Sequence, residues 1–400
     1  MTISNNPPAI SPPTCELDPF SDDAMNDPLL VESQMRDMAP VVYLSKYGCY
    51  AATHYSSVSE IMSNWETFSS AKGVGIYDIT APEHQRMRAQ LLEMDPPEHT
   101  TFRSVHNKVI NPKFIRELRE RFYDASNELV SGLPKNKPFE AISAVAVAYP
   151  MSVFPDLIGV AEVGRENLLP AAALTFNGFG PNNEILARSL EAGQKAQQWL
   201  ISQAQPGAIK NGLAVQTHEV GESLGLSPFD TTALVFGLLS AGLDTTMHGI
   251  GWAIYLLAKN PDQFKKLKEN PELARPAFDE AVRLGSPVKW FGRHSTSSSV
   301  IDGFTIPEDA RVLVFLGAAN RDGRRWEDPL EFNIERQTSG HVGFGAGPHS
   351  CAGQMLARLE GESVLKSLAS YADEIEIVTE PSFDISNSLR GLHSLEIVLR

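Results

Sequence analysis

One stretch of ten residues constrains this chain more than any other: Phe344-Gly345-Ala346-Gly347-Pro348-His349-Ser350-Cys351-Ala352-Gly353. Its three glycines give the backbone a freedom that side chains would remove. The residues from 352 to 360 have a helical composition, so Cys351 is predicted to lie at a helix N-terminus. The unpaired N–H groups and the partial positive charge at such an end favour a thiolate over a thiol. The stretch therefore predicts a cradle for a sulfur that ligates a metal.

The cysteine content by itself favours a plainer interpretation. A single cysteine beside glycines is usually a small buried hydrophobic residue. Cys15 and Cys49 are distant in sequence from Cys351, and no Cys-x-x-Cys pair indicates zinc or a redox disulfide. Three cysteines without a paired motif fit a reducing compartment, and we expect a cytoplasmic protein.

The composition predicts a large globular fold. The chain has 400 residues, of which 42% are hydrophobic, enough to bury a substantial core. Hydrophobic residues recur at helical spacing along most of the chain, while strand-like runs are short, as at 41–52, 299–301 and 311–316. We expect a mainly α fold with a small β-rich lobe, in which residues 1–15 are a disordered lead-in and 16–400 form one domain. The net charge of −15 argues against nucleic-acid binding.

The longest apolar stretch, 233–257, is long enough to span a membrane. Lipid would penalise the polar side chains at its centre, among them Asp244 and His248. We therefore predict a buried helix from 227 to 259 and no membrane anchor.

The middle of this predicted helix, Ser240-Ala241-Gly242-Leu243-Asp244-Thr245-Thr246, contradicts the rules of helix stability. Glycine and threonine lower helix propensity, and a buried acid is costly without a partner or a role. Local rules tend to fail at functional sites. The structural alternative is that Thr245 bonds back to a carbonyl of the preceding turn and that Asp244 forms a salt bridge.

Two further pairs lie one helical turn apart. Glu280 and Arg283 can pair on one helix face, which many surface helices also do. His99 and Arg103 follow a proline-rich helix start, where acids lie near the positive end of the helix. Each pair alone is a weak signal, and an ordinary exposed pair remains the alternative for the second.

Together these patterns resemble the cytochrome P-450 family. The pattern Phe-Gly-x-Gly-x-His-x-Cys-x-Gly matches that family's haem-binding loop at every defined position, and its acid-alcohol and Glu-x-x-Arg motifs precede it in order. The resemblance covers nearly the whole chain from residue 16 onward. It implies the cytochrome P-450 fold and haem b held by a thiolate, which pushes electron density onto iron. It also implies a monooxygenase that uses O₂ as cosubstrate and takes electrons from NAD(P)H through a redox partner.

The resemblance assigns roles residue by residue. Cys351 becomes the metal ligand, and Phe344 belongs to the haem-binding residues. The expected ligands of the haem propionates are His99, Arg103, Arg293 and His349. Glu280 and Arg283 become structural, with a guanidinium from the segment around 324–329 as a third partner. Asp244 and Thr245 are expected to manage proton delivery, a general-acid role.

The substrate is predicted from a finer resemblance. Segments 152–156, 164–170, 176–181 and 389–392 look like the bacterial subgroup that oxidises the para substituent of benzoates. Where that subgroup grips the carboxylate with an Arg-Ser pair, this chain has Phe236 and Gly237, which leave room for a larger head group. A related oxidase acts on alkylphenyl phosphates. We therefore expect a small para-alkyl or para-alkoxy aromatic anion, with an aryl phosphate such as para-cresyl phosphate ahead of a carboxylate.

The substrate pocket is expected at Lys72, Ile76, Phe176, Phe179, Ser240, Ala241, Val288, Phe291 and Leu392. The candidate anion contacts are Lys72, Ser240 and the N–H groups of the 73–75 loop, since glycine loops can form nests for phosphate oxygens. A solvated loop charge is an equally good interpretation of Lys72.

The expected partners are a small aromatic substrate, a ferredoxin and a ferredoxin reductase, with no nucleic acid and no membrane, and the protein is expected to be a monomer. The ferredoxin should dock on the cysteine side, where cations are expected to gather: Arg103, Lys108, Lys113, Arg116, Arg324, Arg325 and Arg358. Two alternatives stay open, a para-substituted benzoate hydroxylase or O-demethylase and a cysteine-ligated haem sensor without turnover. The Asp244-Thr245 pair favours catalysis, because a sensor needs no proton relay.

Overall fold

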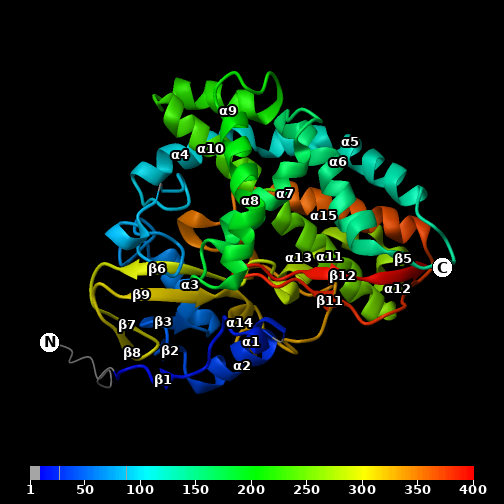
Figure 1. Ribbon diagram of the computed structural model, residues 1–400. Helices are drawn as coiled ribbons and strands as arrows, with labels where there is room; N and C mark the ends of the chain where they lie inside the picture. The colour runs from blue at the N-terminus through cyan, green and yellow to red at the C-terminus, as the bar shows by residue number, and fades with distance from the viewer. Residues whose placement is uncertain (1–9, 27, 87) are drawn as a thin grey trace.

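A helical body and a smaller sheet lobe lie side by side in the computed structural model, which describes residues 10–26, 28–86 and 88–400 (Figure 1). The expectation of a mainly α fold with a small β-rich lobe is confirmed. Most of the expected lead-in, residues 1–9, lies outside the described residues. Its described end joins the sheet lobe, because β1 pairs with β2 in parallel and Ile10 bridges to Phe304.

The main sheet of the lobe has six strands. Their order is β1 (Thr14–Cys15), β2 (Val41–Leu44), β3 (Cys49–Ala52), β9 (Arg311–Phe315), β6 (Trp290–Ser295) and β4 (Phe68–Ser69). The hairpin of β2 and β3 turns at Gly48, whose φ of +61° favours glycine. All residues of β9 are buried, and β6 pairs with it so that Arg293 lies opposite Val312. A cation is thereby placed in the middle of a buried sheet.

Three smaller sheets complete the β structure. Their strands are β10 (Ile375–Ile377), β13 (Glu396–Leu399) and β5 (Phe139–Glu140); β11 (Ser382–Phe383) and β12 (Leu392–Ser394); and β7 (Ser299–Ile301) and β8 (Phe304–Ile306). The β11–β12 hairpin packs near α11, at the boundary between the helical body and the sheet lobe (Figure 1).

Most of the helices form the helical body, while those nearest the N-terminus and the short helix after β9 lie with the sheet lobe (Figure 1). The α-helices are α1 (Asp22–Asn26), α2 (Pro28–Met38), α3 (Tyr55–Ser63), α4 (Glu98–Val109), α5 (Pro112–Ser131), α6 (Ala148–Ile158), α7 (Leu168–Asn177), α8 (Glu184–Gln203), α9 (Gly212–Ser223), α10 (Pro228–Ala241), α11 (Asp244–Lys259), α12 (Pro261–Glu269), α13 (Ala274–Gly285), α14 (Leu316–Asn320) and α15 (Gln354–Tyr371). The short turns are η1 (Pro82–His84), the π-helical η2 (Ile142–Val147), η3 (Arg165–Asn167), η4 (Pro271–Leu273), η5 (Val342–Phe344) and η6 (Gly347–His349).

The helix α11 lies in the core of this body, packed against α13 and α15, and Ile250, Ile254 and Leu257 are fully buried. By length and composition, the stretch Pro228–Lys259 could also cross a membrane. Half of its most apolar window is buried inside the protein, as in the core helix of a globular fold.

The prediction of one continuous helix from 227 to 259 was wrong, because α10 ends at Ala241 and α11 begins at Asp244. A Cβ at Gly242 would collide with the ring of Phe154, so that ring packs directly onto the backbone at the interruption. The hydroxyls of Thr245 and Thr246 donate to the carbonyls of Ala241 and Gly242 at 3.0 and 3.2 Å. Side-chain donors thus satisfy carbonyls that the break leaves without a helical partner.

Candidate active site

The loop before α15 has the shape that its glycines predict. Gly345 and Gly347 have φ of +73° and +65°, in the region that favours glycine. A Cβ at Gly347 would collide with the carbonyl of Met62, so the loop lies directly on the end of α3. The N–H of Cys351 donates to the carbonyl of Phe344 at 2.7 Å, which closes the loop on itself.

Cys351 precedes the first helical residue of α15 by three positions, close to the predicted helix N-terminus. Burial raises the pKa of its thiol, whereas hydrogen bonds from the N–H groups of Gly353 and Gln354 and the charges of Arg103 and Arg358 act to lower it. Among the described residues, no group of three or more His, Cys, Asp or Glu side chains could hold a metal ion. A single cysteine ligand in a loop before a helix fits a metal whose other ligands come with it, as in haem.

The residues predicted to hold the haem propionates converge from three parts of the chain. His99 and Arg103 lie on α4, Arg293 on β6 and His349 in η6, next to the cysteine loop. The rings of His99 and His349 are 4.6 Å apart, and the Nε2 atoms of both are buried without a hydrogen-bond partner. Buried ring nitrogens are normally satisfied, so these two indicate a ligand with acceptor or donor atoms.

The pKa shifts of two residues in this cluster also indicate a bound ligand. Burial, followed by the charges of Arg293, His99 and Arg103, lowers the pKa of His349 to about 3. Burial also lowers the pKa of Arg293 to about 10, while Asp95 acts in the opposite direction. Asp95 already accepts hydrogen bonds from the Ser69 hydroxyl and the N–H of Ser70. Asp95 is thus the acid beside these bases, its carboxylate is held by Ser69 and Ser70, and the convergence of several bases fits the two carboxylates of haem.

The predicted acid-alcohol pair lies at the helix interruption. The Thr245 hydroxyl bonds back to Ala241, which is the structural alternative considered for it, and its oxygen keeps lone pairs that can accept a further hydrogen bond. Within residues 10–26, 28–86 and 88–400, no cation pairs with Asp244, so the alternative of a salt bridge was wrong. Asp244 is 8% exposed. Burial and the charge of Asp384 raise its pKa to about 7, where a carboxyl both holds and releases a proton near neutrality.

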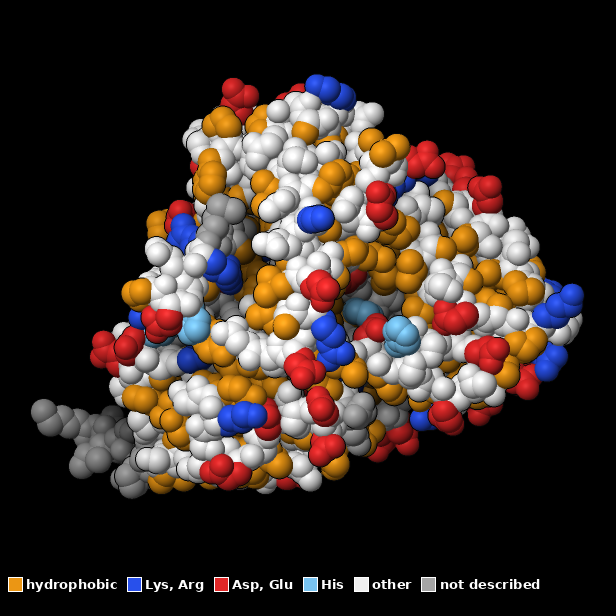
Figure 2. Space-filling view, in the orientation of Figure 1, with side chains coloured by type: hydrophobic (Ala, Val, Ile, Leu, Met, Phe, Trp, Pro, Cys, Tyr) orange, Lys and Arg blue, Asp and Glu red, His pale blue; other side chains and the backbone are white. Residues whose placement is uncertain are grey.

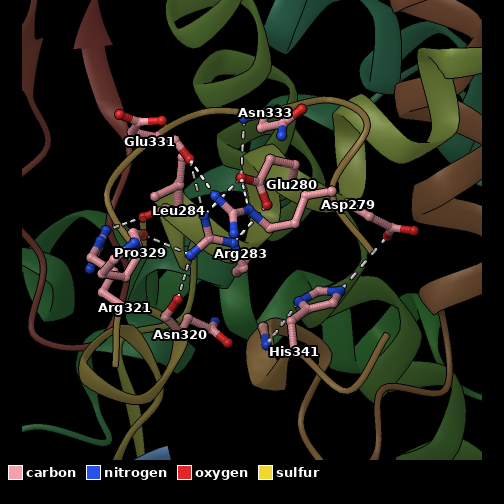
Figure 3. Close-up of polar contacts among 12 residues, drawn as sticks. Asp279, Glu280, Arg283, Leu284, Asn320, Arg321, Pro329, Glu331, Asn333 and His341 are labelled. Carbon is pink, nitrogen blue, oxygen red and sulfur yellow. Dashed lines mark hydrogen bonds and ion pairs between the residues drawn. The ribbon is translucent and has the colours of Figure 1, made fainter. Parts of the chain in front are cut away.

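Glu280 and Arg283 form a fully buried ion pair on α13 (Figure 3). Two N–H groups of Arg283 donate to the two carboxylate oxygens of Glu280, at 2.6 and 2.7 Å. The same guanidinium donates to the carbonyls of Asn320, Pro329 and Glu331, which lie on the segment before the cysteine loop. This pair joins α13 to that segment, in agreement with the predicted structural role.

The third partner of this pair is Arg336, whose Nε donates to Glu280 Oε1 at 2.9 Å. The prediction placed it around 324–329, and there the guanidinium of Arg324 pairs with Asp322 instead. Arg325 lies over the ring of Trp326 and donates to the carbonyl of Ser339. Nothing in the sequence near Arg336 indicates that its side chain folds back to α13.

Five of the predicted pocket residues come together in one apolar cluster. Its buried members include Ile76, Phe176 and Phe179, and Val288 and Phe291 pack against them. The ring centroids of Phe179 and Phe291 are 6.3 Å apart, and the N–H of Ile76 donates to the carbonyl of Phe179 at 2.8 Å. The segment after α7 is thereby held against the loop that follows β4.

Two of the predicted pocket residues, Ser240 and Ala241, are the last residues of α10, just before the acid-alcohol pair. Ser240 is buried, while Ala241 is exposed although Leu243 close by is buried. An open space therefore meets the helix interruption. Leu392 packs in the main helical core and not in this apolar cluster, so its place in the pocket stays a prediction.

The predicted anion contacts in the loop after β4 have partners of their own. The Lys72 ammonium contacts Asp309 at 2.9 Å and Asp78 at 3.6 Å, which favours the interpretation of a surface charge. The buried carboxylate of Glu93 accepts from the N–H of Val74 at 3.0 Å. An acid of this chain thus takes the N–H of Val74 in the predicted phosphate nest at 73–75, which argues against an anion at that position.

A cleft of about 570 Å³ lies behind the cysteine loop and is lined by residues of that loop, of α13, of α15 and of the segment 334–341. Of the predicted site residues, only Phe344 lines it. Of the cations predicted to gather on the cysteine side, Lys108, Lys113 and Arg116 are exposed on α4 and α5. The guanidinium of Arg103 donates to the carbonyl of Ser350, and that of Arg358 pairs with Asp279.

Comparisons with known proteins agree with this geometry. A match to the family model "Cytochrome P-450" spans residues 207–370. The chain is 44% identical to "Cytochrome p450 CYP199A2" of Rhodopseudomonas palustris over 97% of this chain and 94% of that protein. Among solved structures, CYP109Q5 from Chondromyces apiculatus has a TM-score of 0.80 at 26% identity, covering 96% of this chain and 98% of its own. The structure named CREJ, in complex with (4-ethylphenyl) dihydrogen phosphate, has a TM-score of 0.83 at 24% identity, covering 96% and 99%.

Proposed function

The chain belongs to the cytochrome P-450 family, and from this premise we propose that it oxidises the para-alkyl or para-alkoxy substituent of a small anionic aromatic. The favoured substrate class is an alkylphenyl phosphate such as para-cresyl phosphate, and para-substituted benzoates come second. The reaction converts one C–H bond, O₂, two electrons and two protons into a C–OH group and one water.

Haem b, when bound, supplies the activation of O₂, and electrons reach it from a redox partner. Cys351 would ligate the iron, and His99, Arg103, Arg293 and His349 would hold the propionates. The bases offer cationic and N–H donors in a buried region, where such contacts are strong. Together these residues would hold the cofactor by its iron and by its carboxylates.

Asp244 and Thr245 are proposed to control the protons that the reaction consumes. With a pKa of about 7, Asp244 can give up a proton and regain it at neutral pH. Thr245 donates its own hydrogen to Ala241, so its oxygen is left to accept a hydrogen bond and to orient a neighbouring donor. A haem sensor would need neither property, and this pair favours turnover over sensing.

The substrate assignment rests on the open side of α10. A Cβ at Gly237 would meet no atom within 4 Å, so the space beside this residue can hold a head group. The Ser240 hydroxyl, one turn further, has only a long contact of 3.4 Å to the carbonyl of Gly237 and can turn toward a ligand. The cluster of Ile76, Phe176, Phe179, Val288 and Phe291 offers the apolar surface for an aromatic ring.

The test compares para-cresyl phosphate, para-toluate and neutral para-cresol by spectral binding and by product formation in the haem-loaded enzyme. We expect the phosphate to bind and turn over best, and Gly237→Leu to block it by filling the space beside α10. Lys72→Gln is the control and should change nothing, because Asp309 and Asp78 already neutralise that ammonium. Equal use of para-cresol would refute anion recognition, use of toluate alone would refute the phosphate, and binding without any product would favour the sensor.

The redox partner is proposed to be a ferredoxin, reduced by its own reductase, in the cytoplasm where NAD(P)H is available. We place its docking surface on the cysteine side, at the exposed Lys108, Lys113 and Arg116. This surface lies on α4 and α5, and α4 also carries Arg103, whose guanidinium reaches the cysteine loop. The enzyme is proposed to work as a monomer.

A further inference from the structure

A chain of ionisable side chains runs from Asp244 to the surface of the β11–β12 hairpin. His248 lies one turn after Asp244 on α11, and its Nδ1 is 4.0 Å from Asp384 Oδ2. The other oxygen of Asp384 contacts His393 Nδ1 at 3.0 Å. Side-chain exposure rises along this path, from 14% at His248 to 35% at Asp384 and 72% at His393. Figure 2 shows histidine and acidic side chains side by side in the region of β11 and β12.

The packing holds this path in place. A Cβ at Gly391 would collide with the His248 ring, so the ring lies directly against the hairpin backbone. The N–H of Asp384 donates to the carbonyl of Gly391 at 2.9 Å, and the indole N–H of Trp252 donates to the carbonyl of Arg390 at 3.2 Å. The hairpin is thereby fastened to the face of α11 that carries His248 and Trp252.

The charge of Asp384 affects the pKa of both Asp244 and His248. Burial raises the pKa of Asp244 to about 7, and the negative charge of Asp384 acts in the same direction. Burial lowers the pKa of His248, while Asp384 acts to raise it. The neighbouring Arg390 guanidinium pairs with Glu32 at 2.5 Å and is directed to that acid. Asp384 is thus the group that couples the buried end of the path to its exposed end.

We propose that His393, Asp384 and His248 form the route by which solvent protons reach Asp244. Water protonates the exposed ring of His393, which passes its Nδ1 proton to Asp384. Asp384 delivers the proton to His248, which lies one helical turn from Asp244 and passes it to that carboxyl after Asp244 has given up its own. Each group then returns to its starting state, and no electrons move. The inference rests on the proposed role of Asp244 and makes Asp384, His248 and His393 positioning residues of the same reaction.

The first test measures protonation without turnover. Infrared spectra of the ferric holoenzyme are recorded over a range of pH. The carboxyl band that is missing in Asp244→Asn belongs to Asp244 and reports its protonation. Asp384→Asn removes the neighbouring negative charge, so the midpoint of this band should shift to lower pH. Glu380→Gln removes an exposed carboxylate from the same segment and should leave it in place. An unshifted midpoint in Asp384→Asn would overturn the coupling.

The second test measures proton supply during oxidation. The rate of product formation should fall about tenfold or more in Asp384→Asn, with a larger solvent deuterium isotope effect. His393 lies at the exposed end of the path, so His393→Gln should fold like the parent. Its rate of product formation should fall less than that of Asp384→Asn, with the same increase in the solvent deuterium isotope effect. If Asp244→Asn slows the reaction and neither variant does, the route is wrong; if Asp244→Asn has no effect, the proposed function of Asp244 is wrong.

Discussion

The substitution Arg336→Gln tests the buried cluster that joins α13 to the segment before the cysteine loop. Arg336 is 12% exposed, and its guanidinium contacts a carboxylate, Glu280, that is fully buried. Removing one partner of a buried ion pair costs about 3–5 kcal/mol. Glu280 keeps its two hydrogen bonds from Arg283 and one from the N–H of Asn333, so the loss should be smaller. We expect the free energy of unfolding to fall by about 2–3 kcal/mol, the range of a charged hydrogen bond.

The matched control is Arg324→Gln, which removes a guanidinium of the segment from which the third partner was expected. Its side chain is 58% exposed and pairs with Asp322, so its loss should cost no more than about 1 kcal/mol. Arg283→Gln is the upper limit, because it removes both guanidinium hydrogen bonds to Glu280 and leaves the carbonyls of Asn320 and Pro329 without this donor, and little holoprotein should accumulate.

The assay is urea unfolding of the haem-loaded variants, followed by far-ultraviolet circular dichroism and by the haem Soret band. A fall in the midpoint at unchanged slope reports lost stability. The reasoning would be refuted if Arg336→Gln were as stable as Arg324→Gln, since the contact with Glu280 would then contribute nothing.

Three further predictions follow from the site. The folded state holds the Asp244 proton more tightly than the unfolded chain, because its pKa is raised from 3.8 to about 7, so the parent should lose stability as the pH rises through this window. Asp244→Asn should remove that loss of stability. The difference in unfolding free energy between variant and parent should therefore grow by on the order of 4 kcal/mol between pH 4 and 7. A difference that stays constant over this range would contradict the prediction. Thr245→Ala should keep haem and substrate binding but divert electrons to hydrogen peroxide, and product yield per NAD(P)H equal to the parent would show that another group directs the proton. Reversing the charges of Lys113 and Arg116 should slow reduction by the ferredoxin and weaken its dependence on ionic strength, and a rate insensitive to salt would argue against this docking surface.

The sequence predicted those parts of the site that are carried by local motifs. The loop around Cys351, the pair of Glu280 and Arg283 and the turn of α4 with His99 and Arg103 each need only a few consecutive residues. Their geometry is set by glycine conformations and by the spacing of one helical turn, so it can be read along the chain.

The parts that were missed depend on contacts between distant segments. The ring of Phe154 packs on the backbone of Gly242 at the helix interruption, and Glu93 takes the N–H of Val74 from the loop expected to bind phosphate. Arg336 folds back to α13, and Asp384 approaches α11 through a hairpin near the C-terminus. No local pattern encodes such pairings, because they arise only when the elements pack.

The carbon monoxide difference spectrum of the reduced protein tests the central claim most directly. The parent should show the band typical of haem with a thiolate ligand, and Cys351→Ser should lose it, because a hydroxyl is a poor ligand compared with a soft sulfur. Retention of haem by the Cys351→Ser protein, through its propionate ligands, would show that the loss concerns the thiolate and not the fold. A thiolate-type band that persists in Cys351→Ser would contradict the account.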